Sequence, residues 1–373
     1  MNPTQLPRHL LARLARRARR PAIGLQLAEE RINLVQFAGD PAAPRLHAAA
    51  SEAYPEPRDE LLARPAAWRA WLRGVLAGNG FDGRRVVSCL PAAELRLFPV
   101  SCTVGPDQDF ETVLAQVLRE RLRDEIAETI ADYLPIRNED GHDAQREALV
   151  AVASRARVMA HLGHLTAAGL DPVALELGPA ALARLLAFVN TADTRSPYPH
   201  VLVINFGRRH SHVSVIWGRR LVLDREIDFA EDLLVRKVSK VLEMTPDMAL
   251  RLLLSKGLGA EGAAAAGDFA QTLSEVLQAE IALLVGEINK TLVYTASRSR
   301  GRGVDQIYLL GSVGRYPGVD ALLQQLLSVP VTLLDPFAAF EGALAAPTRA
   351  RLSTRAGMAV AAGLALREFR GHA

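Results

Sequence analysis

The sequence contains little that would suit a secreted or membrane-spanning protein. Its two cysteines, Cys89 and Cys102, have no His or Cys partners at metal-ligand spacing, and such isolated thiols indicate buried side chains rather than disulfides. No apolar run reaches the length of about 18 residues that a membrane helix needs, and the best candidate, at 179–189, is interrupted by Arg184. The N-terminus lacks the apolar core and cleavage site of a signal peptide. These absences predict a cytoplasmic protein.

Lysine is also scarce, so arginine supplies most of the positive charge. Residues 1–20 contain six arginines and no acidic residue, although the net charge of the whole chain is only +3. The arginines expected on a basic helical face are Arg13, Arg16, Arg17 and Arg20. This tail is typical either of a segment that lies on an anionic membrane surface or of a solvated leader. It has no aromatic residue for base stacking, so we expect no binding to nucleic acid.

The hydrophobic pattern alternates between predicted strands and helices, which is typical of an α/β fold. The polar stretch at 191–199 divides the chain into two halves. Each half begins with a similar hairpin pattern, AIGLQLAEERINLVQF at 22–37 and VLVINFGRRHSHVSVI at 201–216. Gln26 and Asn205 occupy matching places at the end of the first strand. This internal repeat predicts two related lobes with a cleft between them.

Helical periodicity and helix-start residues predict several helices outside the hairpins. The first two are expected at 57–80 and 106–131, and a long one at 268–296. A further predicted helix carries His161 and His164 in an H-x-x-H pattern. Because no acidic residue stands at the spacing of a metalloprotease motif, this pattern predicts surface or half-buried histidines.

Three stretches resemble the actin-like ATPase superfamily, and most closely its bacterial branch with the cell-division protein FtsA and the pilus assembly protein PilM. They are EALVAVASRARVMAHLGHLTAAGLDPVALELGPAALARLL, IYLLGSVGRYPGVDALLQQLLSVPVTLLDPF and GMAVAAGLALREF. The resemblance implies an α/β, actin-like ATPase fold with two duplicated lobes around a cleft. After the basic tail at 1–20, it implies a first lobe at 21–195 that contains an inserted α/β subdomain at about 101–164. The second lobe is expected at 196–370, with a helical subdomain at about 229–300.

The resemblance also implies which residues face a nucleotide. In the family's ATPases, each phosphate hairpin carries an Asp that positions magnesium, whereas Gln26 and Asn205 stand there in this sequence. Hard cations prefer charged oxygen ligands, and Glu29 and Glu30 in the first turn would repel a triphosphate. We therefore expect a pseudo-ATPase that binds either no cofactor or ATP or ADP without turnover. The positions implied to contact a nucleotide are Gln26, Asn205, Gly207, Arg208, Lys256, Gly311 and Ser312. For Lys256, a helix C-terminal lysine that faces the helix dipole is the alternative.

PilM-like proteins belong to the inner-membrane platform that assembles type IV pili. The resemblance therefore implies a non-catalytic cytoplasmic scaffold, peripheral at the inner membrane. Its implied partners are the N-terminal peptide of a bitopic PilN-like protein, bound at a groove involving the inserted subdomain, and the assembly motor ATPase. The alternatives are a nucleotide-binding actin-like ATPase or filament former, and a component of the type II secretion platform. The latter continues into a transmembrane helix, so the end of this sequence at Ala373 favours the pilus type.

Overall fold

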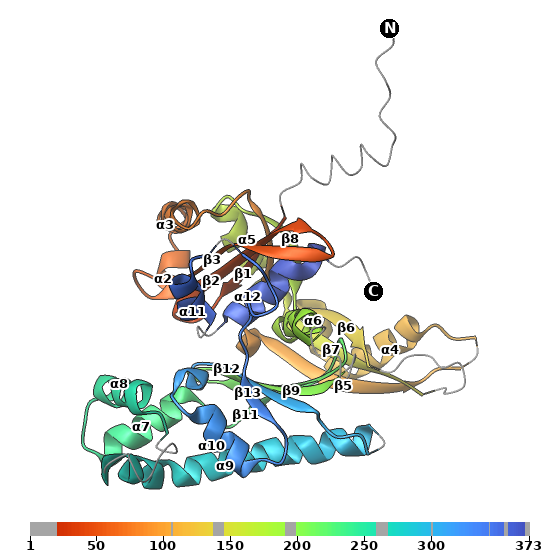
Figure 1. Cartoon of the computed structure of the whole chain (residues 1–373). Helices are drawn as coiled ribbons and strands as arrows, with labels where there is room; N and C mark the ends of the chain where they lie inside the picture. Colours follow the sequence, from red (N-terminus) through yellow and green to blue (C-terminus); the bar gives the residue numbers. More distant parts are fainter. Residues whose placement is uncertain are drawn as a thin grey trace.

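The computed structural model describes residues 21–105, 107–136, 145–190, 199–258, 268–299, 301–342, 344–353 and 357–369. The tail with Arg13, Arg16, Arg17 and Arg20 lies outside the described residues, and so does most of the polar stretch at 191–199. Within the described part, the strands form two five-stranded sheets and one three-stranded sheet. Figure 1 shows the two larger sheets in two lobes, one above the other, with the smaller sheet beside them. No helix of the described residues combines the length and the apolar character that a membrane span requires.

The sheet of lobe 1 has the order β3-β2-β1-β4-β8. Its strands are β1 (Ile23–Leu27), β2 (Arg31–Asp40), β3 (Ala43–Ala53), β4 (Arg85–Cys89) and β8 (Asp171–Glu176). The first three strands are antiparallel, and β4 and β8 continue the sheet in parallel. Such a sheet needs cover on both faces because its central strands are apolar on both sides.

Helices provide that cover. On one face, α3 (Pro65–Gly78) and α5 (Arg155–Ala167) form a core with Ile23 and Leu25, and Trp68 Nε1 ties these helices together by donating to the His164 carbonyl at 2.7 Å. The short helix α2 (Arg58–Leu62) precedes α3. On the other face, α6 (Gly178–Val189) and α12 (Met358–Ala365) pack against Val35 and other residues.

The sheet of lobe 2 repeats this plan, in the order β11-β10-β9-β12-β13. Its strands are β9 (His200–Phe206), β10 (Ser211–Trp217), β11 (Arg220–Ile227), β12 (Gln306–Gly311) and β13 (Val331–Leu333). Again three antiparallel strands are followed by two parallel ones. The helices of this lobe are α7 (Glu231–Val241), α8 (Pro246–Lys256), α9 (Asp268–Arg298) and α10 (Val319–Leu326). The shared strand order and direction confirm the fold class expected from the repeated hairpins, with two duplicated α/β lobes.

The smaller sheet is the inserted subdomain, with the order β5-β7-β6. It consists of β5 (Leu95–Thr103), β6 (Thr129–Pro135) and β7 (Gln145–Ser154), with α4 (Phe110–Leu122) packed on it. The sheet starts at Leu95, before the expected boundary near 101, whereas α5 packs in lobe 1 although it begins inside the expected 101–164.

The helix expected at 106–131 is wrong beyond Leu122. Arg123 has a positive φ of 41°, which interrupts the helix, and 3₁₀ turns lead directly into β6. Tyr133 of β6 then packs edge-on against Phe110, with ring centroids 5.5 Å apart. Packing against α4 and pairing with β7 therefore override the helical periodicity of this segment.

A hydrophobic core joins the two lobes at the base of the cleft. It contains Val35 and Phe37 of lobe 1, Val203 and Val215 of lobe 2, and much of α6 and α12. After β13 the chain returns to lobe 1, where α11 (Ala346–Ser353) lies against β3 and precedes α12. Helix α12 lies so close to β1 that a Cβ on Gly24 would be 2.0 Å from the Ala361 carbonyl oxygen. The lobes are thus bound together at the base, and their hairpins project from it.

Candidate functional site

The two hairpins present equivalent residues to the cleft. Gln26 pairs in register with Asn33, and Asn205 pairs in register with His212. On the other side, Gln26 stands opposite Cys89 of a parallel strand, as Asn205 stands opposite Leu310. Gln26 and Asn205 therefore occupy the same place in the two sheets.

In lobe 1 the amide oxygen of Gln26 belongs to a hydrogen-bond network whose one charged member is the guanidinium of Arg31. Gln26 Oε1 accepts from Asn33 Nδ2 at 3.3 Å, and Asn33 Oδ1 accepts from Ser51 Oγ at 2.7 Å. Arg31 Nε donates to the same Ser51 hydroxyl at 2.8 Å. Gly357, with a φ of 88°, lies against this network, and a Cβ there would be 2.1 Å from Gln26 Oε1. The side-chain oxygens of Gln26 and Asn33 thus accept hydrogen bonds within this network, and none of its members is a carboxylate that could hold a cation.

In lobe 2 the predicted residues Gly207, Gly311 and Ser312 lie together. Ser312 donates from its backbone N to the Phe206 carbonyl at 2.7 Å and from its hydroxyl to the Gly207 carbonyl at 3.1 Å. A Cβ on Gly311 would be 2.1 Å from the Phe206 carbonyl oxygen, so the loop after β12 packs directly on the second hairpin. The backbone carbonyls here serve this packing.

Lys256 is exposed in the last turn of α8. The next residue, Gly257, approaches the loop after β12 so closely that a Cβ would be 1.9 Å from the Pro317 carbonyl oxygen. The structure therefore brings the end of α8 beside that loop, and the position of Lys256 also fits a cation at the negative end of the helix dipole.

The turns of the two hairpins are joined by ion pairs across the cleft. Arg209 Nη1 lies 2.9 Å from Glu29 Oε1, and Arg208 pairs with Glu30. Arg208 also donates from Nε to Asp232 Oδ1 at 3.0 Å, within its own lobe. Arg208, which the resemblance implies as a phosphate contact, is therefore bonded to carboxylates of both lobes.

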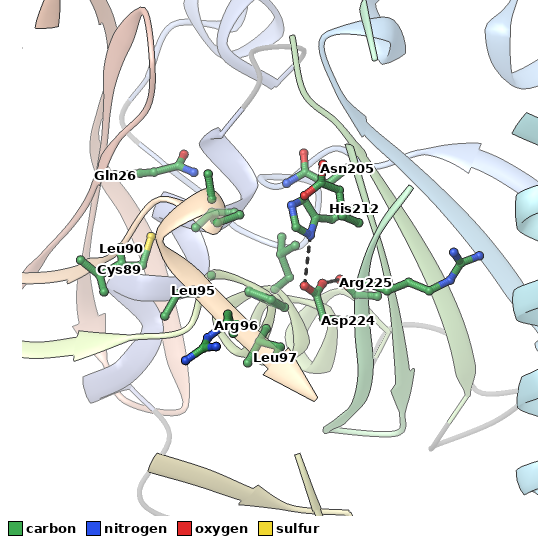
Figure 2. Close-up of a pocket in the computed structure, with 18 residues that line it drawn as sticks. Gln26, Cys89, Leu90, Leu95, Arg96, Leu97, Asn205, His212, Asp224 and Arg225 are labelled. Atoms are coloured by element: carbon green, nitrogen blue, oxygen red, sulfur yellow. Dashed lines mark hydrogen bonds and ion pairs between the residues drawn. The ribbon is translucent and has the colours of Figure 1, made fainter. Parts of the chain in front are cut away.

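A cavity of about 340 Å³ lies below the turns, between the two lobes and the inserted subdomain. Figure 2 shows Gln26 on one side of it and Asn205 and His212 on the other. The apolar part of its wall comes from β5, the segment before it, α6 and α12. These residues are Leu90, Leu95, Leu97, Pro179, Leu182 and Val360.

The polar wall of the cavity contains a group that sequence reasoning missed. His212 Nδ1 lies 3.2 Å from Asp224 Oδ2, and Ser214 Oγ donates to Asp224 Oδ1 at 2.6 Å. Burial lowers the pKa of His212, but the hydrogen bond to Asp224 and the charges of Asp224 and Glu226 outweigh it, so that the pKa is raised. The available signal was the alternation of polar and apolar residues from His212 to Val215 in β10, together with the acidic residues Asp224 and Glu226 in β11.

His161 is 6% exposed, so the prediction that it is a surface or half-buried residue is wrong; His164 is half-buried as expected. His161 Nε2 lies 2.9 Å from Ser88 Oγ, and burial, aided by the charges of His164 and Arg58, lowers the pKa of His161 to about 4. The described residues contain no cluster of three or more His, Cys, Asp or Glu that could hold a metal ion.

The donor set of the cleft does not fit a magnesium nucleotide. The two positions that would orient the cation carry amides, and hard cations prefer charged oxygens. The two turns that would cradle phosphates are bonded to each other. Of the seven positions implied to contact a nucleotide, Gln26 and Asn205 line the cavity. Gly207, Gly311 and Ser312 lie together in lobe 2, whereas Arg208 is held in ion pairs and Lys256 is at the end of α8. Their role as nucleotide contacts stays a prediction.

Comparison with known proteins identifies the fold and the family. A family model described as type IV pilus assembly protein PilM matches residues 107–369. Among solved structures, one titled as the PilM-PilN type IV pilus biogenesis complex has a TM-score of 0.74 at 22% identity and covers 94% of this chain and 99% of its own.

Other solved structures match this chain at lower similarity. The ethanolamine utilization protein EutJ from Carboxydothermus hydrogenoformans has a TM-score of 0.47 at 13% identity, with 98% of this chain and 91% of that chain covered. MreB 5 of Spiroplasma citri bound to AMPPNP has a TM-score of 0.48 at 10% identity, with 84% and 91% covered. The chain has the actin-like ATPase fold. Because the family match spans well over half of its length, the chain belongs to the family of type IV pilus assembly proteins PilM.

Proposed function

We propose that this protein is a non-catalytic scaffold in the inner-membrane platform of a type IV pilus. The observation that carries this proposal is the pairing of the two hairpin turns, Glu29 with Arg209 and Glu30 with Arg208. Gln26 and Asn205 also carry neutral amides at the two positions where the ATPases of the superfamily orient a cation. Membership in the PilM family supports the assignment to pilus assembly.

Loss of hydrolysis follows from these same residues. A phosphate that entered between the turns would displace Arg208 and Arg209 from their carboxylate partners and would meet the unpaired charges of Glu29 and Glu30. Two like charges about 4 Å apart repel by about 4 kcal/mol at an effective dielectric constant of 20. We therefore propose that ATP and ADP are not turned over at this cleft.

The proposed partner is the N-terminal cytoplasmic segment of a PilN-like bitopic membrane protein. The solved complex of PilM with PilN supports a partner of this kind. The cavity beside β5 suits an extended peptide, because apolar side chains such as Leu95 and Leu97 face polar groups such as Asp224 across it. Alternate side chains of an extended segment can then enter the apolar wall while its backbone meets polar groups.

A scaffold that holds the cytoplasmic end of a membrane protein works on the cytoplasmic face of the inner membrane. The arginines of the tail at 1–20 would then add electrostatic attraction to anionic lipids, about 1 kcal/mol for each arginine near the surface. Contact with the assembly motor ATPase belongs to the same proposal.

Peptide binding tests the proposal. The ligand is a fluorescein-labelled peptide with the sequence of about the first 20 residues of the PilN-like protein encoded in the same genome. Fluorescence anisotropy measures its affinity for this protein. We expect saturable binding that Leu97→Asp weakens at least tenfold, because it places a charge in the apolar wall. Leu326→Asp, at an exposed leucine of α10, is the matched control and should bind as the unchanged protein does.

Two results would refute parts of the proposal. Absence of peptide binding by the unchanged protein removes the scaffold assignment. Release of inorganic phosphate from magnesium ATP by the purified protein, abolished by Asn205→Ala, would show an active ATPase instead.

A further inference from the structure

The contact between the two hairpin turns has an internal symmetry. Glu29 and Arg208 each stand three residues after the equivalent positions Gln26 and Asn205, and Glu30 and Arg209 stand four residues after them. The ion pairs run crosswise between these places, since Glu29 meets Arg209 and Glu30 meets Arg208. This is the pattern of a twofold, self-matching interface, with acid in one copy of the hairpin and base in the other.

Hydrogen bonds within each lobe hold the two turns in place, independently of the ion pairs between them. On the basic side, Asp232 donates from its backbone N to the Arg208 carbonyl at 2.9 Å while its carboxylate accepts from Arg208 Nε. On the acidic side, the Tyr54 backbone N donates to the Glu30 carbonyl at 3.1 Å, and the Tyr54 hydroxyl donates to the Ala28 carbonyl at 3.3 Å. The backbone that carries the charged side chains is therefore already ordered in both turns. Less conformational entropy is lost when the ion pairs form.

The contact lies at the end of the cleft opposite to the shared core. Val35, Phe37, Val203 and Val215 lie in the apolar cluster that joins the lobes at the base, whereas the turns stand at the free ends of the same hairpins. Opening of the lobes about this base would break the ion pairs first.

We infer that Glu29, Glu30, Arg208 and Arg209 form a clasp that closes the two lobes, so that ionic contact between the hairpins sets their separation. This clasp goes beyond the proposed scaffold function and does not depend on which partner binds. The four side chains are between 46% and 65% exposed, so dissolved ions reach them. The Debye length falls from about 8 Å at 0.15 M salt to about 3 Å at 1 M, and closure should weaken accordingly.

The experiment measures the distance between the lobes by double electron–electron resonance. Spin labels are attached to Met159→Cys on α5 of lobe 1 and Met248→Cys on α8 of lobe 2, which are 59% and 57% exposed. The native Cys89 and Cys102 are buried and stay unlabelled. The protein is otherwise the full chain, and circular dichroism checks that each variant is folded.

Charge reversal on one side should open the clasp. We expect Arg208→Glu/Arg209→Glu to lengthen and broaden the distance distribution, and 1 M KCl to shift the unchanged protein in the same direction. Arg236→Glu/Arg251→Glu makes the same change of charge on exposed helix surfaces of lobe 2 and should leave the distribution unaltered.

Exchange of the charges distinguishes the clasp from a general loss of stability. Adding Glu29→Arg/Glu30→Arg to the reversed variant should restore the original distance, because the ion pairs form again with opposite polarity. Should the reversed variant fail to fold, the milder Glu29→Gln/Glu30→Gln should show a smaller lengthening. The inference is overturned if reversal and control give the same distribution, if the exchanged variant stays open, or if neutralisation leaves the distance unchanged when reversal cannot be measured.

Discussion

Acid should destabilise lobe 1 through His161. This side chain is 6% exposed, bonded to Ser88, and has a pKa of about 4 instead of the ordinary 6.5. The folded state thus holds the neutral imidazole, whereas the unfolded chain takes up a proton once the pH falls below 6.5. The free energy of unfolding is therefore highest at high pH, where the imidazole is neutral in both states, and it falls as the pH is lowered from 6.5 to 4.

The size of the effect follows from the pKa difference. Each pKa unit corresponds to about 1.4 kcal/mol, so proton uptake by the unfolded chain costs about 2 kcal/mol at pH 5 relative to pH 8. Near pH 4 the cost reaches about 3 kcal/mol. Urea unfolding followed by tryptophan fluorescence measures it, because Trp68 is fully buried in the same core and bonds to the carbonyl of His164.

A variant isolates this residue from all other acid-sensitive groups. His161→Gln does not titrate but can still hydrogen-bond to Ser88, so it should lose about 2 kcal/mol less than the unchanged protein between pH 8 and pH 5. His164→Gln, on the same helix and half-buried, is the control and should keep most of the dependence, because burial is the main cause of the low pKa of His161 and the charge of His164 only adds to it. An unaltered pH dependence in His161→Gln would refute the assignment of the effect to this histidine.

Three further predictions concern the cleft and the helices. Gln26→Asp alone should give no ATP hydrolysis in a phosphate-release assay, because Asn205 remains neutral and the turns remain paired; turnover by this variant would contradict it. Gly357→Ala should lower the free energy of unfolding by at least about 1–2 kcal/mol, the strain of a left-handed backbone, whereas Gly74→Ala in the open middle of α3 should be neutral or raise it by up to about 1 kcal/mol. Thr245→Ala removes the side-chain cap of α8 and should cost about 1 kcal/mol, measured by the same urea unfolding.

Much of the fold could be predicted because it depends on patterns that repeat along the chain. The two hairpins share the positions of their apolar residues and their turns, so the duplication in 22–37 and 201–216 was visible without a structure. The predicted secondary structure was wrong where pairing or packing with another element determines whether a segment is a helix or a strand. Residues 123–131 have helical periodicity, but pairing with β7 and packing against Phe110 make the segment after Glu128 a strand.

The candidate site could be predicted only in part, for a geometrical reason. Matching of the hairpins placed Gln26 and Asn205 at equivalent positions, and the structure has both on one cavity. That the acidic turn faces the basic turn depends on how the lobes pack, which no local pattern encodes. The same holds for Asp224, which joins His212 and Ser214 only because β11 lies beside β10.

The charges of the two turns match each other across the cleft. If both copies of the hairpin carried acid, Glu29 and Glu30 would face carboxylates across the cleft, and if both carried base, Arg208 and Arg209 would face guanidinium groups. Either arrangement would separate the hairpins, because like charges at this distance repel. An acidic first turn is therefore compatible with closed lobes when the second turn is basic. Glu29 and Glu30 thus form one contact with Arg208 and Arg209. The effect of a substitution in one turn on the separation of the lobes therefore depends on the charge of the other turn.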